Sequence, residues 1–188
     1  MKKILRIMSS VVIVICIAFV GLLIYNKIFF YGIAVSGDSM YSTLKDGQIG
    51  YARKIEFVRE VKRGDIISFN LDNRTMVKRV IGLPNESIVL KDHVVYINGE
   101  ALEESYLTDG NDKEISNHGV YSNLTVDLKE DEYYLMGDNR KVSYDSRYFG
   151  PVSYSNFIGK IRIIYATADC NEDCSEVKNV KLIPWILF

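Results

Sequence analysis

The stretch IMSSVVIVICIAFVGLLIYN, residues 7–26, divides this chain of 188 residues into two parts of different chemistry. It contains no charged residue, and about twenty mostly apolar residues are what a helix needs to cross a bilayer. Residues 1–30 hold four of the 23 basic residues and no acidic one, which leaves 19 basic against 24 acidic residues, a net charge of −5, in the remainder. The sequence therefore predicts a cationic membrane-spanning helix followed by an acidic domain.

Three of the four cations, at positions 2, 3 and 6, precede the apolar stretch. The positive-inside rule then places the N-terminus in the cytoplasm and everything after Lys27 on the extracytoplasmic face. A cleavable signal peptide is the alternative, because a basic start followed by an apolar segment describes both. We favour the anchor, since the stretch is long for a signal peptide and the small residues Ala34 and Ser36 lie immediately before a polar motif described below.

The remainder of the chain has the pattern of a mainly β protein. Short runs rich in Val, Ile, Tyr and Phe are separated by Gly, Asp and Asn, without a long stripe of helical period. Asn98-Gly99 is a two-residue hairpin signal. In the last run Ile161, Ile163 and Tyr165 occupy alternate positions, as on the buried side of a half-buried strand. The predicted strands are residues 48–53, 65–71, 75–81, 87–90, 93–98, 132–136 and 158–166.

The polar and acidic residues 103–131 predict a loop-rich insertion, because large aliphatic side chains are scarce there. The last six residues are too short to cross a bilayer, so we expect the tail to dock on the domain, with contact to the membrane interface as the alternative. The predicted organisation is an anchor in residues 1–30, a β core in 31–84 and 132–169, an inserted lobe in 85–131, and a C-terminal tail in 170–188.

Composition and missing motifs exclude several functions. A net charge of −1 and an isoelectric point near 6.1 argue against a nucleic-acid partner. HExxH, P-loop and GxGxxG motifs are absent from the sequence, so we expect no metal, nucleotide or other cofactor. His93 and His118 are expected to be ordinary surface residues. Cys16 lies in the apolar stretch, and the pair Cys170 and Cys174 is open to three interpretations: a local disulfide, two free thiols, or part of a metal site.

Polar residues embedded in apolar strands point to the chemistry. Lys78 and Arg79 are neighbours in a predicted strand, so they face opposite sides of the sheet and one of them is expected to be a buried cation. It could form a buried ion pair with Asp138 or Asp145. Alternatively, desolvation lowers the pKa of Lys78 from its usual value of about 10.4, so that a neutral amine can take the proton of a nearby serine. Ser39 would then be the nucleophile of a Ser-Lys pair.

These clusters, in this order, resemble the sequence boxes of bacterial type I signal peptidases, which are membrane-anchored Ser-Lys endopeptidases of peptidase family S26. Residues 37–44 (GDSMYSTL) resemble the nucleophile box and residues 64–67 (GDII) the strand that follows it. Residues 77–84 (VKRVIGLP) resemble the lysine box. Residues 137–150, which begin GDNR, resemble the final box. With the anchor, the resemblance covers residues 2–168.

The resemblance implies an antiparallel, barrel-like β-sheet domain and assigns roles to residues. Ser39 is the implied nucleophile, with its backbone N–H in the oxyanion hole, and Lys78 is the implied general base. Ser143 is expected to hydrogen-bond the lysine amine and orient it. Supporting ionic residues are expected to be Asp145 with Arg147, and also Asp138 and Arg79.

Departures from the family pattern concern loops and the oxyanion hole. Many members have proline at Ser42 and glycine at Asn85, and we expect these changes to affect loops. Some members place a serine donor two residues before the nucleophile, whereas this chain has Gly37, as Gram-positive-type members do. The second oxyanion donor is therefore left open.

The implied substrates are precursor proteins that carry signal peptides at the bilayer surface. An extended peptide can pair with a strand edge while its small side chains enter shallow pockets. The residues expected to line these pockets, with plain core packing as the alternative, are Ile33, Val35, Gly37, Met40, Leu44, Met76 and Val77. Two other functions remain open: a peptidase dedicated to one substrate, such as a pilin-type protein, and a non-catalytic relative that assists assembly. The second would have lost the serine or the lysine, and this chain keeps both.

Overall fold

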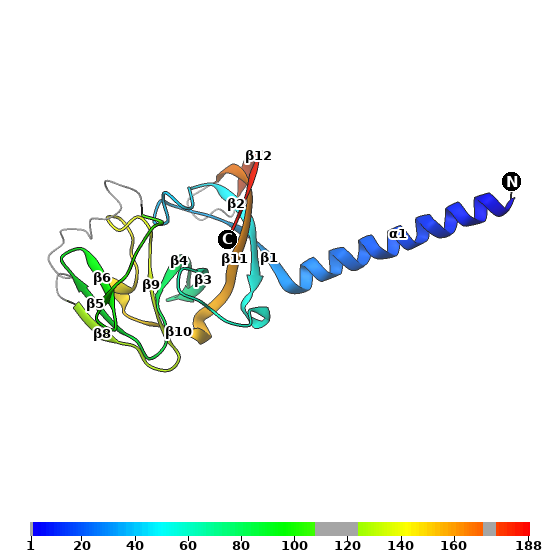
Figure 1. Ribbon diagram of the computed structural model, residues 1–188. Helices are drawn as coiled ribbons and strands as arrows, with labels where there is room; N and C mark the ends of the chain where they lie inside the picture. The colour runs from blue at the N-terminus through cyan, green and yellow to red at the C-terminus, as the bar shows by residue number, and fades with distance from the viewer. Residues whose placement is uncertain (1, 108–123, 171–175) are drawn as a thin grey trace.

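A computed structural model describes residues 2–107, 124–170 and 176–188, and it consists of one long helix attached to a β domain (Figure 1). Helix α1 (Lys2–Phe29) extends away from the β domain. Its segment Arg6–Phe29 is, within the part of the chain that the structure describes, the one helix long and apolar enough to cross a membrane. The apolar part of this segment has no buried residue, and it meets the β domain only near its end, where the Phe29 ring contacts Phe57. An apolar surface of this length is expected to lie against lipid or another protein.

The β domain is built on a large antiparallel sheet with the strand order β1-β2-β11-β3-β4-β9-β10, and β12 pairs with β11 beyond this path. Neighbouring strands in this order are often far apart in sequence, so the sheet brings distant motifs together. Strand β1 follows α1 without a linker and forms one end of the order. The strand bounds are β1 (Phe30–Ala34), β2 (Gln48–Lys54), β3 (Ile66–Leu71), β4 (Arg74–Gly82), β9 (Glu132–Met136), β10 (Val152–Ser153), β11 (Phe157–Cys170) and β12 (Val177–Leu187).

A smaller antiparallel sheet has the order β7-β6-β5-β8. The predicted hairpin at Asn98-Gly99 is confirmed: both residues have positive φ, 51° and 88°, and Ile97 pairs with Glu100 across the turn. These are the dihedral signs of a type I′ turn, which Asn-Gly favours. The bounds are β5 (Ser87–Lys91), β6 (Val94–Ile97), β7 (Glu100–Ala101) and β8 (Leu124–Asp127).

The smaller sheet shares an apolar core with the large one. Ile81 of β4 and Tyr134 of β9 pack in one buried cluster with Ile88 of β5 and Val95 of β6. Burial of these side chains ties the smaller sheet to the large sheet. The division of the chain at residues 85 and 131 stays a prediction.

Each of the predicted strands overlaps an observed strand, but the sequence prediction missed others. Strand β8 lies inside the segment 103–131 that we expected to be loop-rich. Leu124 and Val126 alternate with polar residues and pack on the shared core, a four-residue pattern hidden by the polar surroundings. Strand β1 was missed because it continues directly from the helix. Strand β12 shows that the C-terminal tail docks on the domain, through backbone pairing with β11.

The predicted alternation in the last core strand is wrong. Phe157, Gly159 and Ile161 are buried in β11, followed by Ile164 and Ala166, whereas Ile163 and Tyr165 are half-buried. The register against β2 shifts between residues 161 and 163 and again between 164 and 166. Each such β-bulge inserts one extra residue, so that the side chains after it point to the opposite face of the sheet. The alternating pattern of apolar residues in the sequence gives no sign of where a bulge occurs.

His93 is an exposed turn residue, as expected. Cys16 lies in α1 as a free cysteine. His118 and Cys174 lie outside the described residues, so the expectations for His118 and for the Cys170 and Cys174 pair are not examined by the structure.

Gly50 of β2 is a point where the sheet depends on the absence of a side chain. A Cβ at this position would lie 2.1 Å from the backbone oxygen of Ile163 and 2.6 Å from a methyl group of Ile164. Because backbone cannot move aside as a side-chain tip can, Gly50→Ala is expected to lower the free energy of unfolding by about 1–3 kcal/mol. Chemical denaturation of the detergent-solubilised protein measures this change.

Gly32 of β1 provides the matched control, since nothing lies within 4 Å of a Cβ built there. Gly32→Ala is expected to change the free energy of unfolding by about 0.5 kcal/mol or less. Equal denaturation midpoints for the two variants would contradict the close packing of β2 against β11.

Candidate active site

Ser39 lies in the turn-rich segment 36–44 that joins β1 to β2. Its neighbours Met40 and Leu44 are almost fully buried and belong to an apolar cluster beneath β1, β2 and β11. The Leu44 N–H also donates to the Met40 carbonyl at 2.8 Å. Two apolar anchors therefore hold the segment to the sheet, and Ser39 remains half-buried at its surface.

Lys78 reaches Ser39 from the middle of β4. Its backbone pairs with Ile67 of β3, and its side chain is buried, with 4% of its surface exposed. The Lys78 Nζ atom lies 2.7 Å from Ser39 Oγ. A separation of 2.6–3.2 Å is what direct proton transfer between two groups requires.

The environment of Lys78 favours a neutral amine. Burial, which penalises the charged form, lowers the pKa of Lys78 to about 8. The Asp145 carboxylate acts in the opposite direction, the Arg147 guanidinium adds to the lowering, and Asp138 opposes it. A substantial share of the amine is thus neutral near pH 8.

The loop 137–140 holds the backbone of Ser39. The Asn139 N–H donates to the Ser39 carbonyl at 3.1 Å. Gly137 approaches so closely that a Cβ there would lie 2.4 Å from the same carbonyl oxygen and 2.2 Å from Ser143 Oγ. Ser143 Oγ is buried without a hydrogen-bond partner among the described residues, so the bond that we expected from the Lys78 amine to Ser143 is not formed here.

Asp145 and Arg147 form the ion pair that the sequence led us to expect. The Arg147 Nε and Nη2 atoms donate to the two carboxylate oxygens at 2.8 and 2.9 Å, and both side chains are buried. Asp145 also caps α2 (Ser146–Phe149) by accepting from the Arg147 N–H, and it accepts from the Gly137 N–H at 3.0 Å. Its carboxylate therefore links α2 to the loop beside Ser39.

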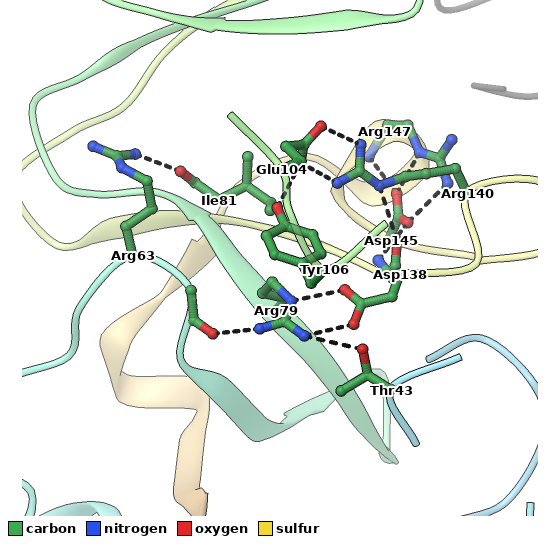
Figure 2. A network of polar contacts seen from close by, with 12 residues as sticks. Thr43, Arg63, Arg79, Ile81, Glu104, Tyr106, Asp138, Arg140, Asp145 and Arg147 are labelled. Carbon is green, nitrogen blue, oxygen red and sulfur yellow. Dashed lines mark hydrogen bonds and ion pairs between the residues drawn. The ribbon is translucent and has the colours of Figure 1, made fainter. Parts of the chain in front are cut away.

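Arg79 lies on the opposite face of β4 and is fully engaged (Figure 2). Its Nε and Nη2 atoms donate to the Asp138 carboxylate at 2.8 and 2.6 Å, and its Nη1 donates to the Gly64 carbonyl at 2.7 Å. Nη2 also contacts Thr43 Oγ1 at 3.2 Å, and the guanidinium carbon lies 4.0 Å from the centre of the Tyr106 ring. This arrangement neutralises the buried charge by a bidentate pair.

The expectation that only one of the two adjacent cations would be buried is wrong. Lys78 and Arg79 are 4% and 8% exposed. Alternation does place them on opposite faces, but both side chains are covered: Ser39 contacts Lys78, whereas Asp138, Thr43 and the Tyr106 ring surround Arg79. Arg79 forms the expected buried ion pair with Asp138, and burial lowers the pKa of Lys78 in the expected direction.

A groove of about 1120 Å³ runs past Ser39 and Lys78. One wall is β1 with the segment that follows it, and the other is the first half of β4. Apart from Leu44, the expected pocket residues all line it, namely Ile33, Val35, Gly37, Met40, Met76 and Val77. Other lining residues that the sequence did not single out include Tyr31, Ser68, Thr75, Asn139 and Tyr144.

The expected position of Leu44 at the groove is wrong. Leu44 has no exposed surface and packs against Ala52, Ile66 and Ile161 in the core. It lies on the inner side of the turn that presents Ser39, so it supports the groove from beneath. Within the described residues, no three His, Cys, Asp or Glu side chains are grouped so that they could hold a metal ion.

Comparison with known proteins identifies the family of this chain. Residues 4–166 match the family described as signal peptidase, peptidase S26. Signal peptidase I of Bacillus licheniformis is 41% identical over 141 residues, which are 71% of this chain and 74% of the relative. Signal peptidase I S of Bacillus subtilis (strain 168) is 38% identical over 152 residues, 78% of this chain and 79% of the relative. The chain belongs to the peptidase S26 family of signal peptidases.

More distant relatives extend the match. Signal peptidase IB of Staphylococcus aureus is 32% identical over 170 residues, 80% of this chain and 85% of the relative. A crystal structure of a signal peptidase I from Enterococcus faecalis V583 shares 33% identity and aligns with a TM-score of 0.48 over 55% of this chain and 97% of that one. Membership of the S26 family makes the protein a hydrolase that acts as a serine peptidase.

The S26 boxes lie around the groove, but the sequence analysis assigned no role to three polar residues beside them, of which Arg140 is buried and Glu104 and Tyr106 are half-buried. Arg140 donates to Glu104, and the Tyr106 hydroxyl also donates to Glu104 (Figure 2). Arg140 belongs to the GDNR motif, and its positive charge was the one sequence signal that pointed to a carboxylate partner. Glu104 and Tyr106 lie in the polar insertion, where no periodicity distinguishes them from surface residues.

Proposed function

We propose that this S26 serine peptidase removes signal peptides from exported precursor proteins, with Ser39 as the nucleophile and Lys78 as the general base. The observation that carries the proposal is the 2.7 Å contact between Lys78 Nζ and Ser39 Oγ at the side of an open groove. Burial of Lys78 supports it, because a lysine with a pKa of about 8 can act as a base near neutral pH.

The proposed reaction passes through an acyl-enzyme. Lys78 Nζ takes the proton of Ser39 as Oγ attacks the scissile carbonyl carbon, and the resulting ammonium returns the proton to the leaving amine. The same amine then takes a proton from water, whose oxygen attacks the ester, and the ammonium returns this proton to Ser39 Oγ as the acyl product leaves. The Ser39 N–H is the proposed oxyanion donor, since backbone N–H groups stabilise charge that develops on the carbonyl oxygen.

Neighbouring residues support these steps in the proposal. Asp145 and Arg147 fix the loop that holds Ser39 and adjust the basicity of Lys78 by their opposing charges. Ser143 is proposed to orient the lysine amine during the reaction, because its buried hydroxyl has no other partner among the described residues. Asp138 and Arg79 have a structural role as a buried pair.

The groove suits an extended peptide. Strand β1 forms one end of the sheet order, and residues 31–35 line the groove, so a substrate strand could add to this edge by backbone hydrogen bonds. Ile33, Val35, Met40, Met76 and Val77 would surround its small side chains. Signal peptides end in such an extended segment with small residues at the cleavage site.

Helix α1 is proposed to anchor the enzyme beside its substrates. Its apolar segment Arg6–Phe29 has the length of a membrane span, and basic residues precede it. In this proposal the N-terminus lies in the cytoplasm and the β domain lies on the extracytoplasmic face of the cell membrane. Ser39 follows Phe29 by only ten residues, which keeps the site close to the bilayer where a signal peptide emerges.

Removal of either reacting group is expected to abolish cleavage. Ser39→Ala and Lys78→Ala should each reduce kcat by at least about a thousandfold, because the acyl-enzyme then cannot form. The assay uses detergent-solubilised protein with a panel of precursors, and mapping of the cut sites shows whether the enzyme is general or dedicated to one substrate. Control variants are Ser155→Ala and Lys91→Ala, exposed residues away from the groove. Substantial processing by a folded Ser39→Ala or Lys78→Ala variant would refute the assignment.

The activity is expected to rise with pH through the pKa of Lys78. Below about pH 8 the amine is protonated and cannot accept the serine proton, so kcat/KM should fall tenfold for each pH unit further down. Measurements of kcat/KM between about pH 6 and pH 10 test this, with circular dichroism at each pH to verify the fold. A midpoint near the ordinary lysine value of about 10.4 would be incompatible with a desolvated base.

Membrane anchoring makes a separate prediction. In cells the full chain should stay in the membrane fraction after carbonate extraction, and its β domain should be digested by protease added to the extracytoplasmic side. A variant that lacks residues 2–29 should appear in the soluble fraction. Protection of the β domain in intact spheroplasts would reverse the proposed orientation, and extraction of the full chain by carbonate would exclude the anchor.

A further inference from the structure

The distance between Ser39 and Lys78 depends on loop 137–140. This loop holds the nucleophile segment through the Asn139 N–H, which donates to the Ser39 carbonyl, and through the close approach of Gly137 to the same oxygen. A displacement of the loop therefore displaces Ser39. Lys78 belongs to a different element, β4. The contact between Lys78 and Ser39 therefore also requires contacts that hold loop 137–140 against β4.

Arg79 provides part of that constraint. It is the next residue after Lys78 on β4, and its guanidinium forms the bidentate pair with Asp138 of the loop. This pair is almost fully buried, with side-chain exposures of 9% and 1%. Buried pairs of this kind hold their geometry only while both partners and their surroundings stay in place.

The inserted lobe completes the constraint from the other side (Figure 2). The Tyr106 ring covers the Arg79 guanidinium at 4.0 Å, a cation–π geometry. Glu104 accepts hydrogen bonds from both terminal nitrogens of Arg140, whose Nε donates to the Gly137 carbonyl at 3.0 Å. The Tyr106 hydroxyl donates to Glu104 at 2.5 Å and joins the two contacts.

Glu104 therefore contacts Arg140 of loop 137–140, and Tyr106 covers Arg79, which pairs with Asp138 of the same loop. We propose that Glu104 and Tyr106 are positioning residues: they clamp loop 137–140 against β4 and so set the separation of Ser39 and Lys78. This inference rests on the proposed Ser-Lys chemistry. Proton transfer needs a hydrogen-bond separation, and a misplacement of about 1 Å can cost about a hundredfold in rate. The lobe then contributes to catalysis without touching the substrate.

The test compares Glu104→Gln and Tyr106→Leu with wild type in the full-length, detergent-solubilised protein, on a precursor that wild type cleaves. We expect kcat to fall by about 10- to 100-fold with KM unchanged within about twofold, because the groove is intact. Tyr106→Phe keeps the ring over Arg79 and is expected to retain most of the activity. Hydrogen–deuterium exchange of peptides that cover residues 137–140 should be faster in Glu104→Gln and Tyr106→Leu.

Two control variants change similar residues of the lobe away from this loop. Glu86→Gln weakens a bidentate pair with Arg63, which also joins the lobe to the core, and Tyr96→Leu removes a half-buried ring on β6. Neither should alter kcat or the exchange of residues 137–140, even where thermal stability falls.

The outcomes separate this inference from the proposed function. Glu104→Gln and Tyr106→Leu proteins that match the controls in kcat and in exchange would overturn the clamp, as would a rise in KM alone. Faster exchange of residues 137–140 in a protein whose wild type cleaves no precursor would support the clamp as a structural device but refute the proposed substrate. Recovery of kcat in Tyr106→Phe, without recovery in Tyr106→Leu, would support the role of the ring over Arg79.

Discussion

The burial of two adjacent cations on β4 is the constraint on which the site depends. A buried charge is costly unless it is paired or neutralised, and the protein meets this cost differently on the two faces of one strand. Arg79 keeps its charge and is paired with Asp138. Lys78 has a hydroxyl as its nearest partner, and burial lowers its pKa instead. One strand therefore supplies both a buried ion pair and an amine with a lowered pKa.

The elements around β4 bury the side chains of Lys78 and Arg79 on its two faces. On the Lys78 side, the segment with Ser39 is held down by apolar anchors in the core beneath β1, β2 and β11. On the Arg79 side, loop 137–140 and the inserted lobe form a layer of ion pairs and a tyrosine ring (Figure 2). The shared apolar core between β4, β9 and the small sheet makes this layer part of the domain. Helix α1 leads directly into β1, so the apolar helix continues into a wall of the groove.

The sequence predicted those features that depend on residue types close together in the chain. The apolar stretch, the Asn98-Gly99 turn and the position of most strands follow from periodicity and turn chemistry. The Ser39 and Lys78 pairing was suggested by a lysine inside an apolar strand and by the order of the sequence boxes. Leu44 was misplaced because an apolar residue in a turn gives no sign of which side it faces. The β11 alternation failed because bulges depend on the neighbouring strand.

The sequence by itself determined the two-part organisation, the β class and the candidates for the reacting groups, because these depend on hydrophobicity, spacing and intrinsic chemistry. Tertiary structure decided which polar residues meet. Glu104 and Arg140 are 36 positions apart, as are Arg79 and Thr43, and their contacts arise from the packing of the lobe and the Ser39 segment against β4. The lowered pKa of Lys78 likewise arises from burial by residues distant in sequence. Desolvation and long-range pairing are properties of the assembled fold, so no local pattern encodes them.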